Sequence, residues 1–126
     1  MFSIDNQSRQ AVYEQIITQV EKYVLSGILA PGDKLPSVRK LSVELNVNPN
    51  TVQRAYAELE RREVLNTQPG RGAYVSDAGG QLLKENHRNN SLKAFEVSVQ
   101  ELKLAGVAKR QLLSIVETYY KGEIQV

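Results

Sequence analysis

The amino-acid sequence predicts a mainly α-helical protein that carries one small β-hairpin and a helical C-terminal tail. In several segments, apolar residues recur at three- and four-residue spacing, the period of an amphipathic helix. The turn Pro69-Gly70-Arg71-Gly72 separates two short strand-like stretches, 64–68 and 73–75. The 126 residues are enough for one small domain with an extension. The predicted order is therefore three helices, a hairpin and two further helices.

The first helix is predicted from about Gln10 to Ser26, and Gly27 supplies the left-handed residue that ends it. The apolar stripe of this helix comprises Val12, Ile16, Val20, Tyr23 and Val24. The Pro31-Gly32 pair indicates a turn with proline at its second position and glycine at its third. Leu29 and Leu35 flank this turn, and we expect both side chains in the core.

A short second helix is predicted after Ser37, a residue type that accepts a hydrogen bond from the first turn of a helix. Its inward side chains are Val38, Leu41 and Leu45. Asn46 tolerates the left-handed conformation that would end this helix. We expect Val47 to place its side chain inside the turn that follows.

The third helix is predicted to begin at Asn48-Pro49, an N-cap residue followed by a proline at the first helical position. Its buried stripe comprises Val52, Ala55, Tyr56 and Leu59. The opposite side is polar and carries Asn50, Gln53, Arg54, Glu58 and Arg61. Such a helix packs against its own domain with one side and presents the other to solvent or a partner.

Composition divides the chain into a domain at residues 1–76, a small polar hinge at 77–80 and a helical tail at 81–126. Within the tail, helices are predicted at about 81–105 and 108–121. Their apolar side chains include Leu92, Phe95, Val99, Leu102, Leu112, Ile115, Val116 and Tyr119. Because two short helices cannot bury these stripes alone, we expect them to join two copies of the chain in a homodimer.

Composition also narrows the functional class. The chain has no cysteine and one histidine, which excludes disulfides, thiol catalysis and cysteine-bound zinc. We expect His87, in a polar stretch, to be solvated. Without a phosphate-binding glycine loop or spaced metal ligands, the sequence predicts no enzyme, no metal site and no cofactor. No apolar run could span a membrane and the N-terminus does not look like a secretion signal, so the expected location is the cytoplasm.

Two helices joined by a tight turn, followed by a hairpin, form the pattern of a winged helix-turn-helix. Its second helix fits the DNA major groove and reads bases with residues near its N-terminus. Asn50 and Gln53 can pair with adenine and Arg54 with guanine, and Thr51 offers a hydroxyl or a methyl group. The net charge is only +2, but seven basic residues outnumber four acidic ones between Lys34 and Ser76.

Two arginines outside the third helix also suit DNA. Arg39 lies on the outer side of the second helix, where it is either a phosphate or base contact or an ordinary surface residue. Arg71 lies between two glycines at the hairpin tip, which suits the minor groove or its phosphates but also fits a plain turn. Tyr13 and Tyr56 could stack on bases. Their helical spacing places both on buried stripes, so we expect them to pack in the core.

Several motifs follow one another along the chain. They are Ile4-Asp5 with Ser8, Tyr13-Glu14-Gln15-Ile16, the stretch Pro31–Leu41, the stretch Val47–Tyr56 with Leu59-Glu60, and Gly70-Arg71-Gly72 with Tyr74-Val75. In this order and at these separations, they resemble the GntR superfamily of bacterial regulators over about residues 4–76. The short two-helix tail is similar to that of its YtrA-type subgroup.

The resemblance implies a winged helix-turn-helix protein that binds a palindromic operator in double-stranded DNA as a homodimer. The implied DNA contacts are Arg39, Asn48, Asn50, Thr51, Gln53, Arg54, Gly70, Arg71 and Gly72. Similarity to the YtrA-type subgroup implies a dimerising tail and repression of the protein's own operon, often one that encodes a transporter. The resemblance identifies no small-molecule effector.

Three residues depart from the superfamily pattern. Glu63 stands where glycine is usual, so either the third helix ends differently or a left-handed strain of about 1 kcal/mol is accepted. Ser42 replaces the usual alanine, and Ala11 replaces a frequent proline.

The alternative function is a winged helix that binds only proteins. Such a module would carry apolar anchors on the outer side of the third helix. Because Asn50, Gln53 and Arg54 are polar, the sequence favours DNA.

Overall fold

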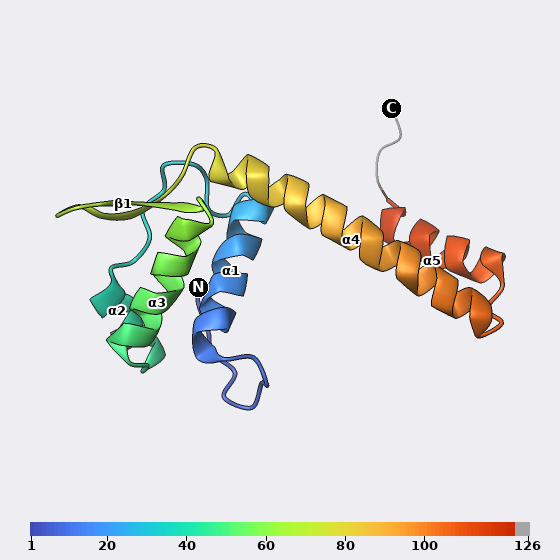
Figure 1. Ribbon diagram of the computed structural model, residues 1–126, viewed down its shortest axis with the longest axis horizontal. Coiled ribbons are helices and arrows are strands. Elements are labelled where there is room, and N and C mark those ends of the chain that lie inside the picture. Colours follow the sequence, from blue (N-terminus) through green and yellow to red (C-terminus); the bar gives the residue numbers. More distant parts are fainter. Residues whose placement is uncertain (123–126) are drawn as a thin grey trace. The chain divides into compact units, whose positions relative to one another are not determined.

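The computed structural model describes residues 1–122 and has five helices and one two-stranded antiparallel sheet in that range. The helices are α1 (Val12–Ser26), α2 (Val38–Leu45), α3 (Pro49–Arg61), α4 (Gly79–Leu104) and α5 (Lys109–Tyr120). The strands are β1 (Leu65–Gln68) and β2 (Gly72–Val75) (Figure 1). The chain forms two compact units, Met1–Asn86 and a second that begins at His87. The predicted mainly α-helical fold with a hairpin wing is confirmed.

Helix α1 begins at Val12, about two residues later than predicted, because the segment before it has other hydrogen-bond partners. The side-chain oxygen of Gln15 accepts a hydrogen bond from the Asp5 N–H at 2.9 Å. Its amide nitrogen donates to the carbonyl oxygens of Asp5 and Gln10, both at 3.0 Å. The segment is therefore held against α1 instead of continuing the helix. Gly27, with φ 83°, ends α1 as predicted.

The core of the first unit is built from the apolar stripes that the sequence predicts. Its buried side chains come from α1, α2, α3, the hairpin and the segments that join them. The largest fully buried ones are Ile16, Leu35, Leu41, Leu59 and Leu65 with Val20, Val52, Val64 and Val75. All four residues predicted for the α3 stripe are buried, as are Leu29 and Leu35 beside the Pro31-Gly32 turn. Helix α3 is thus fixed on one side and free on the other.

The Pro31-Gly32 turn is closed by the Asp33 N–H, which donates to Ala30 O at 3.0 Å, and Gly32 has φ 87° as the predicted turn requires. The chain then runs along β2, where Leu35 N–H donates to Ala73 O and Val75 N–H to Asp33 O, each at 2.9 Å. This added edge of the hairpin was not predicted. It consists of a single bridge between Lys34 and Tyr74, too short for a strand pattern.

Of the two alternatives for Glu63, the structure has the second: α3 ends in a left-handed conformation at this non-glycine residue. Glu63 has φ 64°, Val64 N–H donates to Leu59 O, and Glu63 N–H donates to Glu60 O. These two bonds form a Schellman motif, which normally places glycine at this position. The end of α3 therefore has the usual backbone geometry, with glutamate at the position where glycine is normal.

The sequence predicts a hinge at 77–80, but in the structure Gly79 and Gly80 already belong to α4. Gly79 is buried, and its N–H donates to Ser76 Oγ at 2.9 Å. A Cβ on Gly79 would lie 2.1 Å from Glu63 O. The glycine thus permits close packing where the sequence indicated flexibility, and the division between the two units falls after Asn86, within the helix.

The second unit contains the rest of α4 and the whole of α5. A turn at Gly106, with φ 83°, joins the two helices. The last predicted residues of the tail, 123–126, lie outside the described part of the chain. Within residues 1–122, no helix combines the length and apolar character needed to cross a membrane.

Candidate nucleic-acid interface

The turn between α2 and α3 is fixed by caps on both helices. Ser37 Oγ accepts from the Lys40 N–H at 3.1 Å at the start of α2, and Asn46 ends that helix with φ 54°. Asn48 Oδ1 accepts from the Asn50 N–H at 2.8 Å at the start of α3. These contacts confirm the predicted caps. They set the direction in which α3 leaves the turn.

A buried tyrosine ties α3 to the segment before α2. The Tyr56 hydroxyl donates to Pro36 O at 2.8 Å, and the residue is buried. Burial, together with the nearby Glu44 carboxylate, raises the pKa of Tyr56, so the hydroxyl stays protonated and remains a donor. The expectation that Tyr56 packs in the core is confirmed.

The residues predicted to contact DNA lie at the surface of the first unit. Arg39, Asn48, Asn50, Gln53, Arg54, Gly70 and Arg71 are exposed, whereas Thr51 and Gly72 are half-buried. Asn48 uses its side-chain oxygen for the helix cap. Its NH₂ group is therefore the part that can reach a partner.

Gln53 and Arg54 line two different hollows on either side of the outward face of α3. Gln53 lines a small cleft of 140 Å³ together with residues of the α2 region and the hairpin, such as Ser37 and Thr67. Arg54 lines a groove of 640 Å³ between α1 and α3. Ala57 borders both hollows and so marks the outward ridge between the two flanks. The adjacent pair, predicted together as base readers, thus faces two different directions.

Arg54 is stacked on an aromatic ring of α1. Its Cζ atom lies 3.7 Å from the centroid of the Tyr13 ring, which is a cation–π contact. Tyr13 is half-buried and packs against the core with part of its surface. The expectation that Tyr13 packs in the core is therefore met in part, because the exposed face of its ring carries the arginine.

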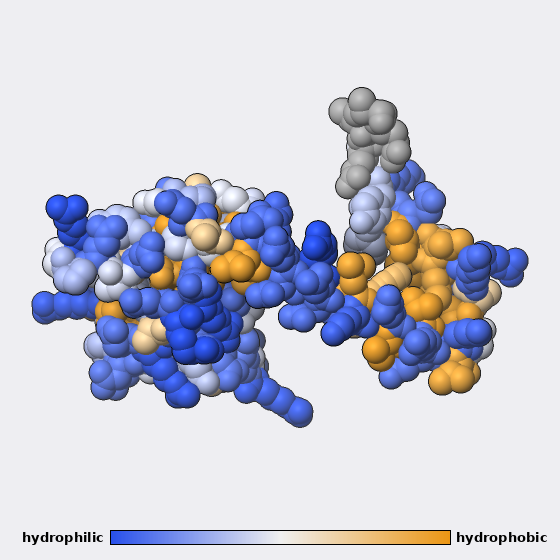
Figure 2. Space-filling view, turned by 45° about the horizontal axis from the view of Figure 1, so that its top comes forward, coloured by the Kyte–Doolittle hydropathy of each residue, from blue (hydrophilic) through white to orange (hydrophobic). Residues whose placement is uncertain are grey.

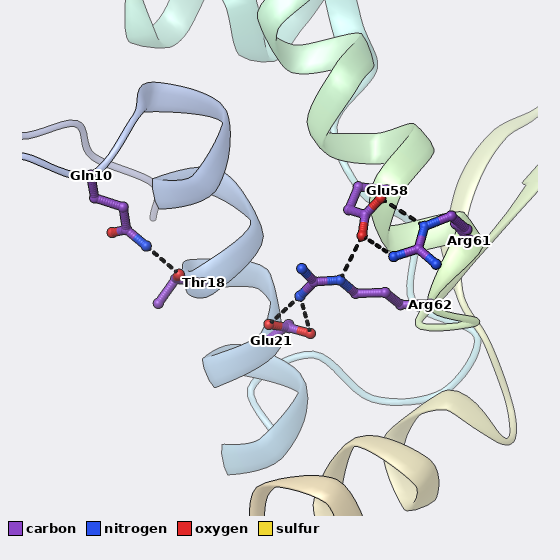
Figure 3. A network of polar contacts seen from close by, with 6 residues as sticks. All are labelled: Gln10, Thr18, Glu21, Glu58, Arg61 and Arg62. Atoms are coloured by element: carbon purple, nitrogen blue, oxygen red, sulfur yellow. Dashed lines mark hydrogen bonds and ion pairs between the residues drawn. The ribbon is translucent and has the colours of Figure 1, made fainter. Parts of the chain in front are cut away.

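The other arginines of this groove are bound to carboxylates. Arg62 lies between α1 and α3, where Nη1 donates to both oxygens of Glu21 at 3.2 Å and Nε donates to Glu58 Oε1 at 3.0 Å (Figure 3). Arg61 donates to Glu58 Oε2 at 2.9 Å. Hydrogen bonds from Arg61 and Arg62 lower the pKa of Glu58 to about 2. This network joins the two helices and neutralises both arginines.

The hairpin presents Arg71 at its tip. Arg71 N–H donates to Gln68 O at 2.9 Å, and Gly70 occupies the third position of this turn with φ 76°. Gly72 has φ 115°, and a Cβ there would lie 3.2 Å from Cε of Lys34. The predicted turn is present, and it leaves the Arg71 side chain exposed.

Two residues beside the predicted contacts have neighbours that the sequence did not predict. Lys34 lies against Gly72 because the segment 33–35 pairs with β2. Tyr13 lies under Arg54, although 41 positions separate the two in the chain. Neither proximity has a local sequence signal, since both depend on contacts between distant segments.

The second unit carries an apolar surface. Figure 2 shows hydrophobic residues gathered over the C-terminal part of α4 and over α5. Leu92, Phe95, Val99 and Leu102 of α4 are 58, 43, 36 and 39% exposed. Ile115, Val116 and Tyr119 of α5 are exposed as well, whereas Leu112 is half-buried. Leu92, Phe95 and Val99 also line a shallow hollow on α4.

Comparison with known families and proteins gives a consistent result. Residues 12–75 match the family model described as bacterial regulatory proteins, gntR family. The HTH-type transcriptional repressor YtrA of Bacillus subtilis (strain 168) is 41% identical over 112 residues, covering 89% of this chain and 86% of that protein.

Solved structures resemble the chain over most of its length. A transcriptional regulator from Oenococcus oeni has a TM-score of 0.76 at 30% identity, covering 92% of this chain and 96% of the other. A GntR family transcriptional regulator from Listeria monocytogenes has a TM-score of 0.73 at 31% identity, covering 91% and 98%. The similarity therefore includes the helical tail as well as the domain with the hairpin.

Proposed function

The chain belongs to the GntR family of bacterial regulatory proteins and is a DNA-binding transcription regulator, and we propose that it is a dimeric repressor that reads a palindromic operator with α3. One observation carries the proposal. The outer side of α3 presents exposed Asn50, Gln53 and Arg54, while its inner side is locked in the core. A rigid helix with base-pairing side chains near its N-terminus is what major-groove recognition requires.

The predicted contact residues divide into three groups. Asn50 and Gln53 carry amides that can pair with adenine, and Thr51 can contact a thymine methyl group or a phosphate. Arg39 lies on α2, the helix of the motif that crosses the DNA backbone, and Asn48 caps the start of α3. The wing, with Gly70, Arg71 and Gly72, carries one exposed cation, Arg71, and we expect it to enter the adjacent minor groove.

The apolar surface of the tail supports a homodimer. Residues of α4 and α5, namely Leu92, Phe95, Val99, Leu102, Leu112, Ile115, Val116 and Tyr119, form the proposed contact between two copies. A contact of twofold symmetry would present two α3 helices to two half-sites. The operator would then be a palindrome with half-sites about one helical turn apart, or a multiple of that spacing.

Repression is the proposed outcome of binding, because the similar protein YtrA is named a repressor. The proposed target is the protein's own operon. A regulator of this kind acts where the bacterial chromosome lies, so we place it in the cytoplasm. The proposal includes no catalytic activity and no cofactor.

A winged helix that binds only proteins is the other function considered. That function needs apolar anchors on the outer side of α3. The exposed side chains there are amides and an arginine, and the central residue between them is Ala57. DNA is therefore the favoured partner.

The test is a footprinting experiment on the DNA upstream of the protein's own gene, with an unrelated duplex as competitor. We expect a protected palindrome that survives competition. Gln53→Ala should reduce the preference for that site. The control Arg88→Ala, which changes an exposed residue of α4, should not. Equal protection of both duplexes, lost at moderate salt, would contradict specific recognition and leave only attraction to phosphates.

A further inference from the structure

We propose that Tyr13 is a positioning residue that holds Arg54 on the α1 flank of α3, where the arginine contacts the DNA backbone and not a base. This inference rests on the proposed DNA-binding function. It begins from the stacked pair, in which the Arg54 guanidinium carbon lies 3.7 Å from the centre of the Tyr13 ring. The ring is itself anchored, because Tyr13 is half-buried against the core.

The stacking leaves the hydrogen-bond donors of Arg54 free. A guanidinium lying on a ring face keeps its N–H groups at its edge, pointing away from the ring. Within residues 1–122, the ion pairs join Arg61 and Arg62 to Glu58 and Glu21, and none involves Arg54. Arg54 is therefore the arginine of this groove whose charge is available to an anionic partner.

The position of Arg54 on α3 indicates whether it contacts the DNA bases or the sugar-phosphate backbone. The major groove is about 12 Å wide and a helix with its side chains measures about 10–12 Å across, so the helix nearly fills the groove. Side chains that are free to extend from the helix into the groove then meet base edges, whereas a side chain held sideways against a neighbouring helix, as Arg54 is against α1, meets the sugar-phosphate wall on that side. Arg54 leans toward α1 on one flank, away from the ridge at Ala57.

Tyr13 lowers the entropy cost of the contact between Arg54 and DNA. An arginine side chain loses rotamer entropy when it is immobilised. Stacking on Tyr13 restricts the side chain before DNA arrives, so less freedom is lost on binding. The tyrosine thus acts through Arg54 and needs no contact with DNA of its own.

The experiment measures binding of the full chain to the footprinted operator, to its single-base variants and to an unrelated duplex, over a range of salt concentrations. Arg54→Ala should weaken binding to all duplexes by similar factors and lower the slope of log affinity against log salt by about 0.9. Tyr13→Leu should weaken binding about two- to fivefold, the value of an exposed cation–π contact. Tyr13→Phe keeps the ring and should bind like the parent.

The decisive measurement is the double variant. If Tyr13 acts through Arg54, Tyr13→Leu should have no further effect in a chain that already carries Arg54→Ala. An equal loss in both backgrounds would overturn the positioning role. Loss of discrimination at one base pair, with an unchanged salt slope, would make Arg54 a base reader. A parent chain that does not prefer the operator would instead contradict the proposed function. In that case, the slopes of log affinity against log salt on the unrelated duplex would still test the role of Tyr13 and Arg54.

Discussion

At the scale of single residues, Glu63 shows how a local cost is accepted to keep a useful geometry. Its φ of 64° places a non-glycine residue in the left-handed region, which costs about 1–2 kcal/mol. The same residue closes the Schellman motif of α3, and its carbonyl oxygen accepts a hydrogen bond from Ser76 Oγ. The strained backbone therefore serves both the end of α3 and the start of α4.

We expect Glu63→Gly to raise the free energy of unfolding by about 0.5–1 kcal/mol. Glycine removes the left-handed strain, but it adds unfolded-state entropy that offsets about 0.4–1 kcal/mol of that gain. Urea denaturation followed by circular dichroism measures the difference. Glu63→Ala is the matched control, since it removes the same charge while keeping the Cβ. A gain of equal size in the alanine variant would show that charge, and not backbone strain, is responsible.

At the scale of elements, α1 and α3 are joined by the network of Glu21, Glu58, Arg61 and Arg62 (Figure 3). The network lies at the C-terminal half of α3, away from the capped N-terminal end that we propose enters DNA. It therefore fixes the C-terminal half of α3 against α1 and leaves the N-terminal end of α3 accessible. Because it uses two arginines internally, the local positive charge available to DNA is smaller than the sequence count indicates.

The network also predicts a pH dependence. Hydrogen bonds from Arg61 and Arg62 lower the pKa of Glu58 from its ordinary 4.5 to about 2. A lowered carboxyl pKa contributes stability that is present above pH 4.5 and is lost as the pH falls toward 2. Glu58→Gln should therefore be less stable than the parent at neutral pH, and the difference should shrink over that range.

Urea titrations of both chains at a series of pH values give the measurement. The control places Glu58→Gln in a chain that already carries Arg61→Ala and Arg62→Ala, where the pH-dependent difference should disappear. A difference that persists unchanged down to pH 2 would mean that the carboxylate charge of Glu58 is not what stabilises the contact.

At the scale of the whole molecule, the chain combines a unit with its own buried core and a unit whose large apolar side chains are mostly exposed. The first can fold around its core, whereas the second needs a cover for its apolar surface. A second copy of the chain is the cover that we propose. The linkage of two DNA-binding units would also raise operator affinity, because the second half-site is then bound at high effective concentration.

We expect Phe95→Glu to shift the chain from dimer to monomer in sedimentation velocity and to weaken operator binding at least tenfold. Burying an unpaired carboxylate in an apolar contact is strongly unfavourable. Val97→Glu is the matched control, because at 100° per residue Val97 lies on the opposite side of α4 from Phe95 and Val99. A dimer that survives Phe95→Glu, or one that both variants abolish equally, would contradict this interface.

Much of the first unit follows from the sequence, because its signals are local. The caps at Ser37 and Asn48, the left-handed residues Gly27 and Asn46, and the buried stripe of α3 depend on neighbours within a few positions. The same local signals place the predicted contact residues on α2, α3 and the wing. Their roles as DNA contacts remain proposals that the experiments above test.

What only the tertiary structure decided is how distant segments meet. The Gly79-Gly80 pair indicated a hinge, but contact with Glu63 and Ser76 packs it tightly at the start of α4. The helical period alone sets Arg54 and Gln53 100° apart on α3. Only packing decides that Arg54 lies against Tyr13 of α1 and that Gln53 lines the cleft beside the hairpin. Composition and period thus determined which residues are inside and which are polar and exposed. The partner of each exposed side chain depends on packing between segments, which no local pattern encodes.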